Sequence, residues 1–194
     1  MKVILLASAL TLTAATAFAA PVSYKVDPAH TYPSFEADHM GGVSVWRGKF
    51  NTSSGTIVYD KEAKTGTIDI TIDMTSLNFG HDKLNEHAMK DPNMFDVAKY
   101  PTATFKGKLA KFNGATPTEA DGELTMHGVT KPVTLKINSF LCKPHPMTKK
   151  EVCGADASAI INRGDFGVNY ALAAPFNFKP DVKLSIQVEA NIEG

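Results

Sequence analysis

The chain has 194 residues, a formal net charge of zero and 21% charged residues. A hydrophobic fraction of 43% supplies enough apolar surface for a folded core, which excludes a disordered chain. Balanced charge also excludes the basic excess of a typical nucleic-acid-binding protein, so we expect no nucleic-acid partner.

Residues 1–19 have the pattern of a secretory signal peptide. Lys2 supplies a positive charge, residues 3–12 form an apolar run, and residues 17–19 form a small-residue cleavage motif. We predict cleavage after Ala19 and a single mature domain over residues 20–194. No later apolar run reaches the length of a membrane-spanning helix. The sequence therefore predicts an exported protein that does not itself span a membrane, and the style of the signal favours a bacterial periplasm.

A period of two dominates the mature chain and predicts antiparallel strands with one buried face. Apolar and polar residues alternate, clearly or weakly, over residues 22–26, 35–39, 67–74, 105–109, 124–126, 133–138, 157–161 and 182–190. One further strand is predicted over residues 47–60, with Gly55 as a bulge. Because no long helical pattern separates the runs, parallel βαβ units are not expected.

Turn-forming sequences separate these strands, and one helix is predicted. The turns are expected at residues 60–66, 113–114, 121–122 and 128–132. Residues 82–90 are good helix formers, with Leu84 and Ala88 one turn apart. Asp91 and Pro92 resemble a cap followed by proline and predict a further short turn. A second helical or irregular segment is predicted over residues 164–174.

Strands with one apolar face must either pack as two sheets or close into a barrel. About eight strands make a barrel just wide enough to hold its own side chains or one small ligand. The pattern alone leaves the sandwich as an alternative.

The two cysteines, Cys142 and Cys153, close a short loop. In an oxidising compartment this favours a disulfide. The alternative is a metal site completed by His145, but no C-x-x-C motif is present. We therefore predict a disulfide and no metal.

Several motifs resemble those of the YceI-like family of exported bacterial proteins. They are Tyr24–His30, Phe35 with His39, Gly48–Phe50, Met94–Phe105, Gly122–Val133 and Ile161–Gly167. The resemblance implies an all-β fold: an extended lipocalin-like antiparallel eight-stranded barrel with one or two short helices. It also implies a carrier of polyisoprenoids or isoprenoid quinones, and a membrane cytochrome b as a partner of some relatives. Thr31 stands where many relatives have Ser, and residues 80–83 lack the Arg-Asp pair of many relatives.

Aromatic residues and methionines supply candidates to line such a barrel, although each one taken alone is as well explained as an ordinary core residue. Alternation places His39 in register with Phe35, and Arg163 is suited to hold a phosphate or quinone oxygen. The alternative for Arg163 is a pair with Asp165 that locks the loop. The predicted ligand-binding residues are Phe35, His39, Trp46, Phe50, Leu77, Phe79, Met94, Phe95, Phe105, Met126, Arg163, Phe166 and Phe176.

No catalytic motif of the H-E-x-x-H, G-x-S-x-G or phosphate-loop type occurs in the sequence. We therefore predict a binding protein and not an enzyme, without a covalent cofactor, that encloses an isoprenoid lipid or quinone. Two alternatives remain. One is a periplasmic enzyme or electron-transfer partner of a membrane cytochrome b. The other is an interaction module whose barrel is filled by its own side chains.

Overall fold

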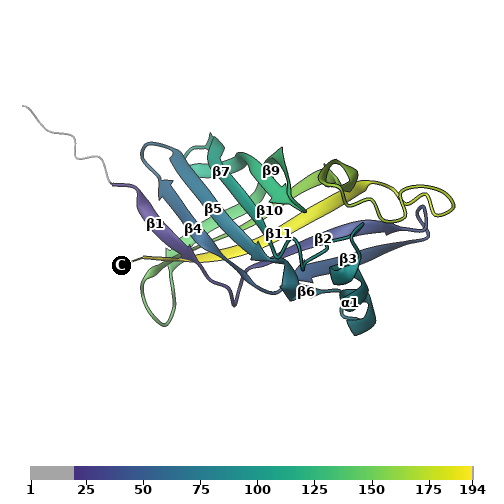
Figure 1. The fold of residues 1–194 in the computed structure, drawn as a ribbon. Helices are drawn as coiled ribbons and strands as arrows, with labels where there is room; N and C mark the ends of the chain where they lie inside the picture. The colour runs from purple at the N-terminus through teal and green to yellow at the C-terminus, as the bar shows by residue number, and fades with distance from the viewer. Residues whose placement is uncertain (1–19, 194) are drawn as a thin grey trace, which may run out of the picture.

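The fold is known from a computed structural model that describes residues 20–193. The predicted signal peptide, residues 1–19, lies outside the described residues. Figure 1 shows an elongated barrel with one helix packed against its side. The strands are β1 (Val22–Val26), β2 (Tyr32–His39), β3 (Ser44–Phe50), β4 (Ser53–Asp60), β5 (Thr65–Asp73), β6 (Leu77–Asn78), β7 (Thr102–Asn113), β8 (Thr116–Met126), β9 (Val129–Pro144), β10 (Glu151–Asn162) and β11 (Asp181–Ile192). The helices are α1 (Asp82–Lys90) and the short 3-10 helices η1 (Met74–Ser76) and η2 (Arg163–Phe166).

Strand β11 closes the barrel because it pairs with strands on both of its edges. The hydrogen-bonded order β1-β4-β5-β7-β8-β9-β10-β11 forms a ring, since β11 also pairs with β1. Every pair is antiparallel. The closed ring confirms the predicted eight-stranded antiparallel barrel and excludes the sandwich.

Strands β2, β3 and β6 extend ring strands beyond short breaks. Residues 27–31 separate β1 from β2, residues 51–52 separate β3 from β4, and η1 separates β5 from β6. The pairings β2–β3 and β3–β6 repeat the ring pairings β1–β4 and β4–β5, so the extensions keep the strand order of this part of the ring. The three extensions lengthen one side of the barrel beyond the closed ring.

The predicted unbroken strand over residues 47–60 is wrong. The break lies at Asn51 and Thr52, whose backbone N–H groups donate to the carbonyl and hydroxyl oxygens of Ser76, at 3.1 and 3.0 Å. Gly55, the predicted bulge, keeps its register with Ile70. Its φ of +146° and the 2.1 Å between an added Cβ and a backbone carbonyl oxygen explain the glycine by close backbone approach.

The predicted turn at residues 121–122 is also wrong. Gly122 lies within β8 opposite Gly107, and a Cβ at Gly122 would come within 2.6 Å of the Phe105 ring. The glycine therefore makes room for an aromatic side chain inside the sheet. The neighbouring turn falls at His127 and Gly128, and β9 begins at Val129.

Helix α1 has the predicted bounds, Asp82–Lys90. His81 caps its first turn by accepting a hydrogen bond from the Leu84 N–H at 3.3 Å, and Ala88 is fully buried. The expected second helical turn after Asp91 is not helical. Residues 91–101 form irregular turns instead, held to the helix because the Phe95 N–H donates to the Ala88 carbonyl at 3.1 Å. This segment carries Met94 and Phe95 toward the barrel.

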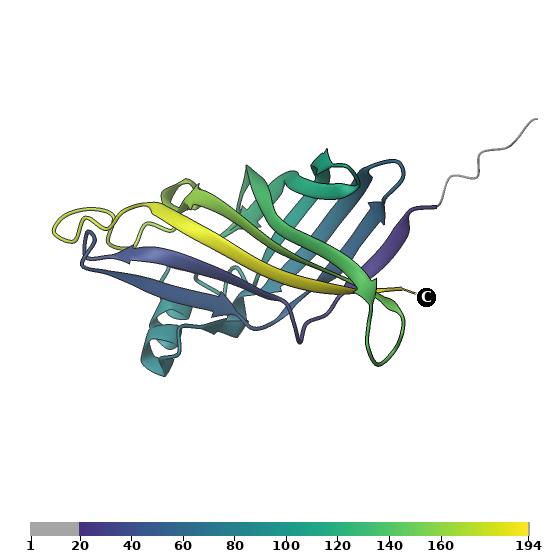
Figure 2. The same cartoon turned by 180° about the vertical axis from the view of Figure 1, so that it is seen from behind.

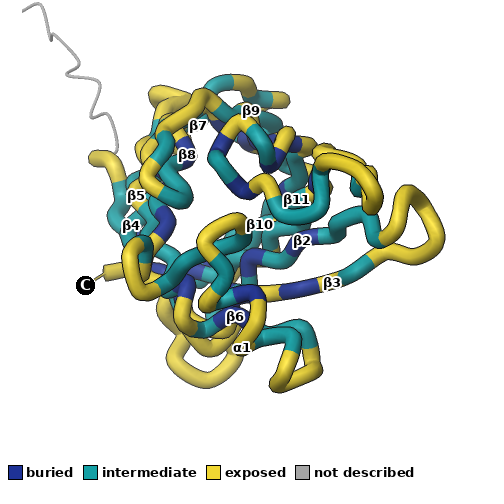
Figure 3. The backbone as a smooth tube through the Cα atoms, turned by 45° about the vertical axis from the view of Figure 1, so that its right-hand side comes forward, coloured by how far each residue is buried: buried dark blue, intermediate teal, exposed yellow. Residues whose placement is uncertain are grey.

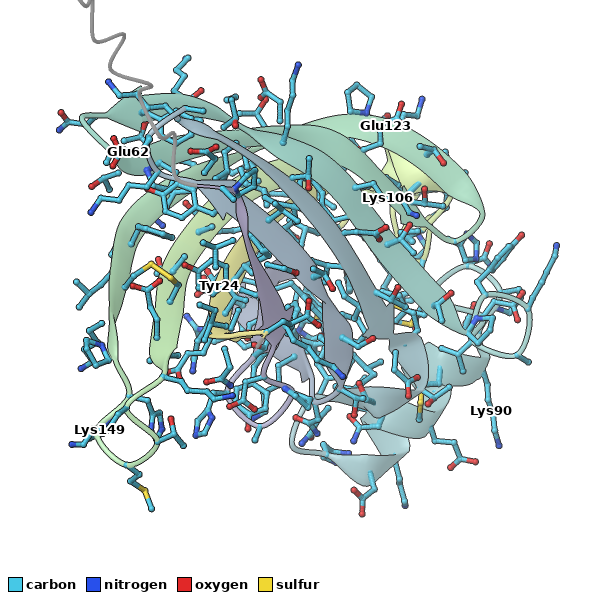
Figure 4. All side chains as sticks on the ribbon, turned by 90° about the vertical axis from the view of Figure 1, so that its left-hand side faces the viewer. Tyr24, Glu62, Lys90, Lys106, Glu123 and Lys149 are labelled. Atoms are coloured by element: carbon cyan, nitrogen blue, oxygen red, sulfur yellow. A yellow bond between two sulfur atoms is a disulfide. The ribbon has the colours of Figure 1, made fainter. Side chains whose placement is uncertain are left out.

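The predicted disulfide is present: Cys142 and Cys153 are bonded and pair across β9 and β10. The metal alternative is therefore wrong for these two residues. Figure 4 looks along the barrel at this end, with the disulfide in yellow and Tyr24 nearby, while Lys106 and Glu123 point outward from the strands. Within residues 20–193, no helix is long and apolar enough to cross a membrane.

Candidate ligand-binding site

A cavity of about 190 Å³ lies inside the closed ring, and we name it the barrel chamber. Its wall is almost wholly apolar because the inward positions of the alternating strands carry aliphatic and aromatic side chains. The wall includes Ile57, Ile68, Ile70, Ile72, Phe105, Leu109, Leu124, Val133, Leu135, Ile137, Ala157 and Ile186. Empty cavities of this kind stay dry unless an apolar guest fills them.

A second cavity of about 110 Å³, the outer chamber, lies among the strand extensions, residues 94–95 and the segment after η2. Most of its wall is apolar or aromatic, with Ala37, Trp46, Phe79, Met94, Phe95, Val168, Phe178 and Val182. Three polar residues also line it: Asp38, Arg163 and Tyr170. The outer chamber thus differs from the barrel chamber by offering polar groups.

Five side chains line both chambers, and we name them the collar: Phe35, Phe50, Met126, Ile161 and Leu184. The Phe35 ring lies 5.9 Å from the Phe50 ring and 6.0 Å from the Phe95 ring, measured between centroids. Opposite Phe35 on β3 is Gly48, where a Cβ would come within 2.5 Å of that ring. The chambers are therefore neighbours that share the collar as a common wall, to which Phe35 and Phe50 contribute aromatic rings.

The far end of the barrel chamber meets a small buried cluster, which we name the floor: Tyr24, Tyr59, Phe140, Cys153 and Ala190. Tyr59 and Phe140 also line the chamber. Tyr24 donates its hydroxyl to Glu151, and Tyr59 donates to the Ala115 carbonyl. Burial raises the pKa of both phenols, so each remains a neutral donor. Packed side chains thus close this end of the barrel.

Arg163 places a buried guanidinium at the wall of the outer chamber. It donates to the carbonyls of Val168 and Tyr170, at 3.2 and 2.8 Å. Among the described residues no carboxylate lies within 4.0 Å of it, so the alternative interpretation, a pair with Asp165, is wrong. Burial lowers its pKa, whereas Asp38 opposes that shift; arginine stays charged in any case. The remaining N–H donors suit an oxygen of a bound molecule.

The YceI-like domain family matches residues 24–190, which is most of the chain. The chain belongs to the YceI-like family. It is 32% identical to a UPF0312 protein of Pseudomonas aeruginosa over 185 residues, covering 94% of this chain and 93% of the relative. A UPF0312 protein of Vibrio parahaemolyticus is 34% identical over 140 residues, covering 70% of this chain and 73% of the relative.

Solved structures share the fold of this YceI-like protein. The Campylobacter jejuni YceI protein has a TM-score of 0.63 at 25% identity and covers 78% of this chain and 88% of its own. BcnA of Burkholderia cenocepacia has a TM-score of 0.64 at 21% identity, covering 85% and 99%. A polyisoprenoid-binding domain from Saccharophagus degradans, implicated in plant cell wall breakdown, has a TM-score of 0.61 at 16% identity, covering 89% and 99%. These comparisons give no support to a cytochrome b partner.

Most of the predicted site residues of the YceI-like protein line a chamber. They are Phe35, Trp46, Phe50, Phe79, Met94, Phe95, Phe105, Met126 and Arg163. Four do not. Leu77 and Phe166 are buried in the core beside the chambers, His39 stacks on the Trp46 ring at 4.3 Å, and Phe176 is 55% exposed.

Other residues that line the chambers were missed by the sequence analysis. In the outer chamber they include Asp38, Val168, Tyr170 and Phe178. In the barrel chamber they are mainly the aliphatic residues of β4, β5, β8, β9 and β11. The alternation of these aliphatic residues with polar ones is the pattern from which they could have been predicted to line the barrel. No period marks Val168, Tyr170 and Phe178, because they lie in irregular backbone.

The YceI-like protein brings no group of histidines together among its described residues. His127 contacts the Phe166 carbonyl through Nδ1 at 3.3 Å, and its buried Nε2 has no hydrogen-bond partner in the described chain. The one described cluster of metal-ligating residue types is Cys142, Glu151 and Cys153, whose two sulfurs are joined to each other. The two chambers are therefore suited mainly to enclosing an apolar molecule.

Proposed function

We propose that this YceI-like protein is a periplasmic binding protein that encloses one long apolar molecule, a polyisoprenoid or an isoprenoid quinone. The observation that carries the proposal is the pair of adjoining chambers, of about 190 and 110 Å³, that share an apolar collar, one inside the closed ring and one among the strand extensions. An interior filled by its own side chains would leave no such space. Reversible burial of the guest is the mechanism.

The energetics of burial favour a featureless chain as the guest. Burying one methylene is worth roughly 0.8 kcal/mol, so a five-carbon isoprene unit contributes about 4 kcal/mol before costs. Two or three enclosed units offset an association cost of about 4–15 kcal/mol. Affinity therefore needs no polar contact, and the apolar collar and barrel wall are sufficient for it.

Orientation of the guest is the role proposed for Arg163. Its guanidinium lines the outer chamber while the barrel chamber is apolar, so a polar head group is stabilised on the outer side of the collar. The apolar chain then extends through the collar toward the floor. The proposed contacts with the guest are those of Phe35, Trp46, Phe50, Phe79, Met94, Phe95, Phe105, Met126 and Arg163.

Two observations support the periplasm as the location. The Cys142–Cys153 disulfide is typical of proteins that fold in an oxidising compartment. The sequence of residues 1–19 has the pattern of a secretory signal peptide. The fold shared with the polyisoprenoid-binding domain of Saccharophagus degradans supports the class of guest.

The test uses protein purified from a bacterial periplasm without detergent. We expect native mass spectrometry and solvent extraction to detect a bound isoprenoid lipid or quinone. After extraction, an added isoprenoid quinone should quench the fluorescence of Trp46, the only tryptophan of the chain, which lines the outer chamber. A protein that releases no apolar molecule and shows no saturable quenching contradicts the proposal.

A further inference from the structure

Exposed apolar side chains gather at one end of the barrel, and we name them the apolar tip: Met40, Val43, Val45 and Phe176. Between 47% and 75% of each is exposed. Met40 and Val43 lie in the turn of the β2–β3 hairpin, Val45 lies near the start of β3, and Phe176 belongs to the segment between η2 and β11. Both segments reach the same end of the elongated molecule in opposite views (Figures 1 and 2). Figure 3 shows the hairpin as an exposed projection.

One carboxylate holds the two segments of the apolar tip together. Asp38 Oδ2 accepts hydrogen bonds from the backbone N–H groups of Gly41, at 3.0 Å, and Lys179, at 2.9 Å. Gly41 lies in the hairpin and Lys179 follows the Phe176 segment. These hydrogen bonds hold the hairpin and the Phe176 segment together, so the apolar tip is a single surface.

A series of aromatic contacts connects the apolar tip with the collar. Phe176 lies 6.1 Å from Phe178, and Phe178 lies 5.2 Å from His39, between ring centroids. His39 stacks on Trp46 at 4.3 Å. From Trp46 the path continues to Phe79 at 6.1 Å and from there to Phe35 at 5.5 Å. The exposed tip is thus continuous with the wall of the outer chamber.

We propose that the apolar tip inserts into the surface of a lipid bilayer and that the guest passes between bilayer and outer chamber along this aromatic path. The passage of a guest rests on the proposed function, whereas the insertion does not. A guest made of isoprene units dissolves in a bilayer, so docking there removes the need to cross water.

The form and charge of the tip favour lipid over a protein partner. A stable protein interface buries about 800 Å² on each side, which four side chains on two loop ends do not offer as a flat surface. Separate apolar side chains that project from loops fit among lipid head groups. Lys179 lies beside the hairpin, and its ammonium nitrogen Nζ forms no ion pair within 4.0 Å among the described residues, so this charge can attract anionic lipid.

Three exposed apolar side chains outside the apolar tip provide a matched control. Met147 is exposed in the loop between β9 and β10, at the end away from the tip (Figures 1 and 2). Leu141 and Ile160 are exposed on strands β9 and β10. These three side chains are 62% to 85% exposed, as much as those of the tip, but none takes part in the aromatic path.

The first experiment measures flotation of the protein with vesicles of phosphatidylglycerol and phosphatidylcholine. We expect Met40→Ser/Val43→Ser/Phe176→Ser to lower the vesicle-bound fraction at least about tenfold, because several methylene equivalents leave the bilayer. Leu141→Ser/Met147→Ser/Ile160→Ser should bind as the unchanged protein does. Equal binding by both triple variants, or no binding by the unchanged protein, overturns the proposal. Thermal unfolding verifies that both variants are folded.

The second experiment separates this proposal from the proposed function. The quenching of Trp46 is followed while an isoprenoid quinone is supplied either from detergent micelles or from the same vesicles. The tip variant should keep its affinity for micellar quinone and lose about tenfold in the rate of uptake from vesicles. Unchanged uptake from vesicles overturns the tip as the portal, whereas absent quenching from both sources contradicts the proposed function.

A third experiment tests whether the apolar tip binds a second copy of the chain instead of lipid. Sedimentation of the unchanged protein and of the tip variant measures self-association. A concentration-dependent dimer that the tip substitutions abolish assigns the tip to a protein interface and overturns insertion into lipid.

Discussion

The hydroxyl of Thr31 makes two hydrogen bonds with the backbone of Glu189. It donates to the Glu189 carbonyl at 3.2 Å and accepts from the Glu189 N–H at 3.2 Å. Thr31 is the last residue of the break between β1 and β2, where β11 changes its partner from one strand to the other. The Asp27 N–H also donates to the Glu189 carbonyl, at 2.8 Å, so the Thr31 side chain supplements the backbone hydrogen bonds across the break and supplies the acceptor for the Glu189 N–H.

Replacing Thr31 by valine should destabilise the barrel by about 1–3 kcal/mol, because a buried N–H group loses its acceptor. The side chain is 2% exposed, so water cannot replace the hydroxyl. Thr31→Ser, which keeps both hydrogen bonds, is the control and should cost clearly less. Urea unfolding measures both, and equal losses for the two variants would contradict this role.

Replacing Ala157 by phenylalanine should block the barrel chamber. Ala157 is buried and lines that chamber, so the added ring occupies the space of the guest. We expect saturable quenching of Trp46 by an isoprenoid quinone to weaken at least about tenfold, with overpacking limited to about 1–3 kcal/mol. Ile160→Phe adds an aromatic ring on the outer face of the same strand and should leave binding unchanged. Normal binding by Ala157→Phe would exclude the barrel chamber as the site.

Replacing Arg163 by methionine should separate head-group binding from chain binding. We expect the affinity for an isoprenoid quinone to fall about tenfold, since a hydrogen bond to a charged group is worth about 1.5–3 kcal/mol. Squalene, which has no polar head, should compete for the site as well as before. Arg163→Lys retains the charge and should lose less affinity for the quinone. Equal losses for quinone and squalene would assign Arg163 to the support of residues 168–170 alone.

Asp27 and His30 should make stability depend on pH. His30 Nδ1 lies 2.8 Å from Asp27 Oδ2, and this hydrogen bond raises the pKa of His30 and lowers the pKa of Asp27. The contribution of His30 is present below its ordinary pKa and is lost as pH rises through the raised value. The contribution of Asp27 is present above its ordinary pKa and is lost as pH falls through the lowered value.

The two contributions coincide between about pH 4 and pH 6.5, the ordinary values of the two groups. Asp27→Asn should therefore lower the melting temperature most in that window and less at pH 9, where the contribution of His30 is lost and only that of Asp27 remains. It should also return the pKa of His30, followed by NMR, toward its ordinary value. A pKa of His30 that the substitution does not change would show that the pair makes no contribution.

Loss of the disulfide should destabilise the protein by about 2–3 kcal/mol, because the unfolded chain is freed from a short loop. Cys142 and Cys153 are separated by 11 positions. Urea unfolding with and without reductant, compared with Cys142→Ser/Cys153→Ser, measures the effect. Reductant should not affect the double variant. If reductant leaves the unchanged protein equally stable, the disulfide does not contribute as expected.

Local patterns predicted much of the fold. The bounds of α1 follow from helix formers bracketed by a cap at one end and Asp91-Pro92 at the other, which are local effects. The alternation in β5 and β11 likewise depends on one buried face of each strand. The breaks could not be predicted, because the hydroxyls of Thr31 and Ser76 bond to segments distant in sequence. The turn at residues 121–122 was predicted wrongly for a related reason, because the Phe105 ring that requires a glycine at position 122 lies on another strand.

The site was predicted in part for similar reasons. Phe105 and Met126 were found as large apolar residues on predicted strands. Phe176 and Phe178 look alike in the sequence, yet one is exposed and the other lines the outer chamber. Their loop has no repeating geometry that would assign a direction to each ring. Only the packing of that loop against His39 and Trp46 decides between them.

The floor closes one end of the barrel, so the ligand-binding site is a sleeve that is open at the other end only. A chain that enters past the collar stops at Tyr59 and Phe140, so the depth of the sleeve limits how many carbon atoms can be covered. Guests shorter than that depth differ in affinity with every added unit. Beyond it, additional units remain outside and contribute nothing, so affinity should level off at a chain length that the sleeve itself defines.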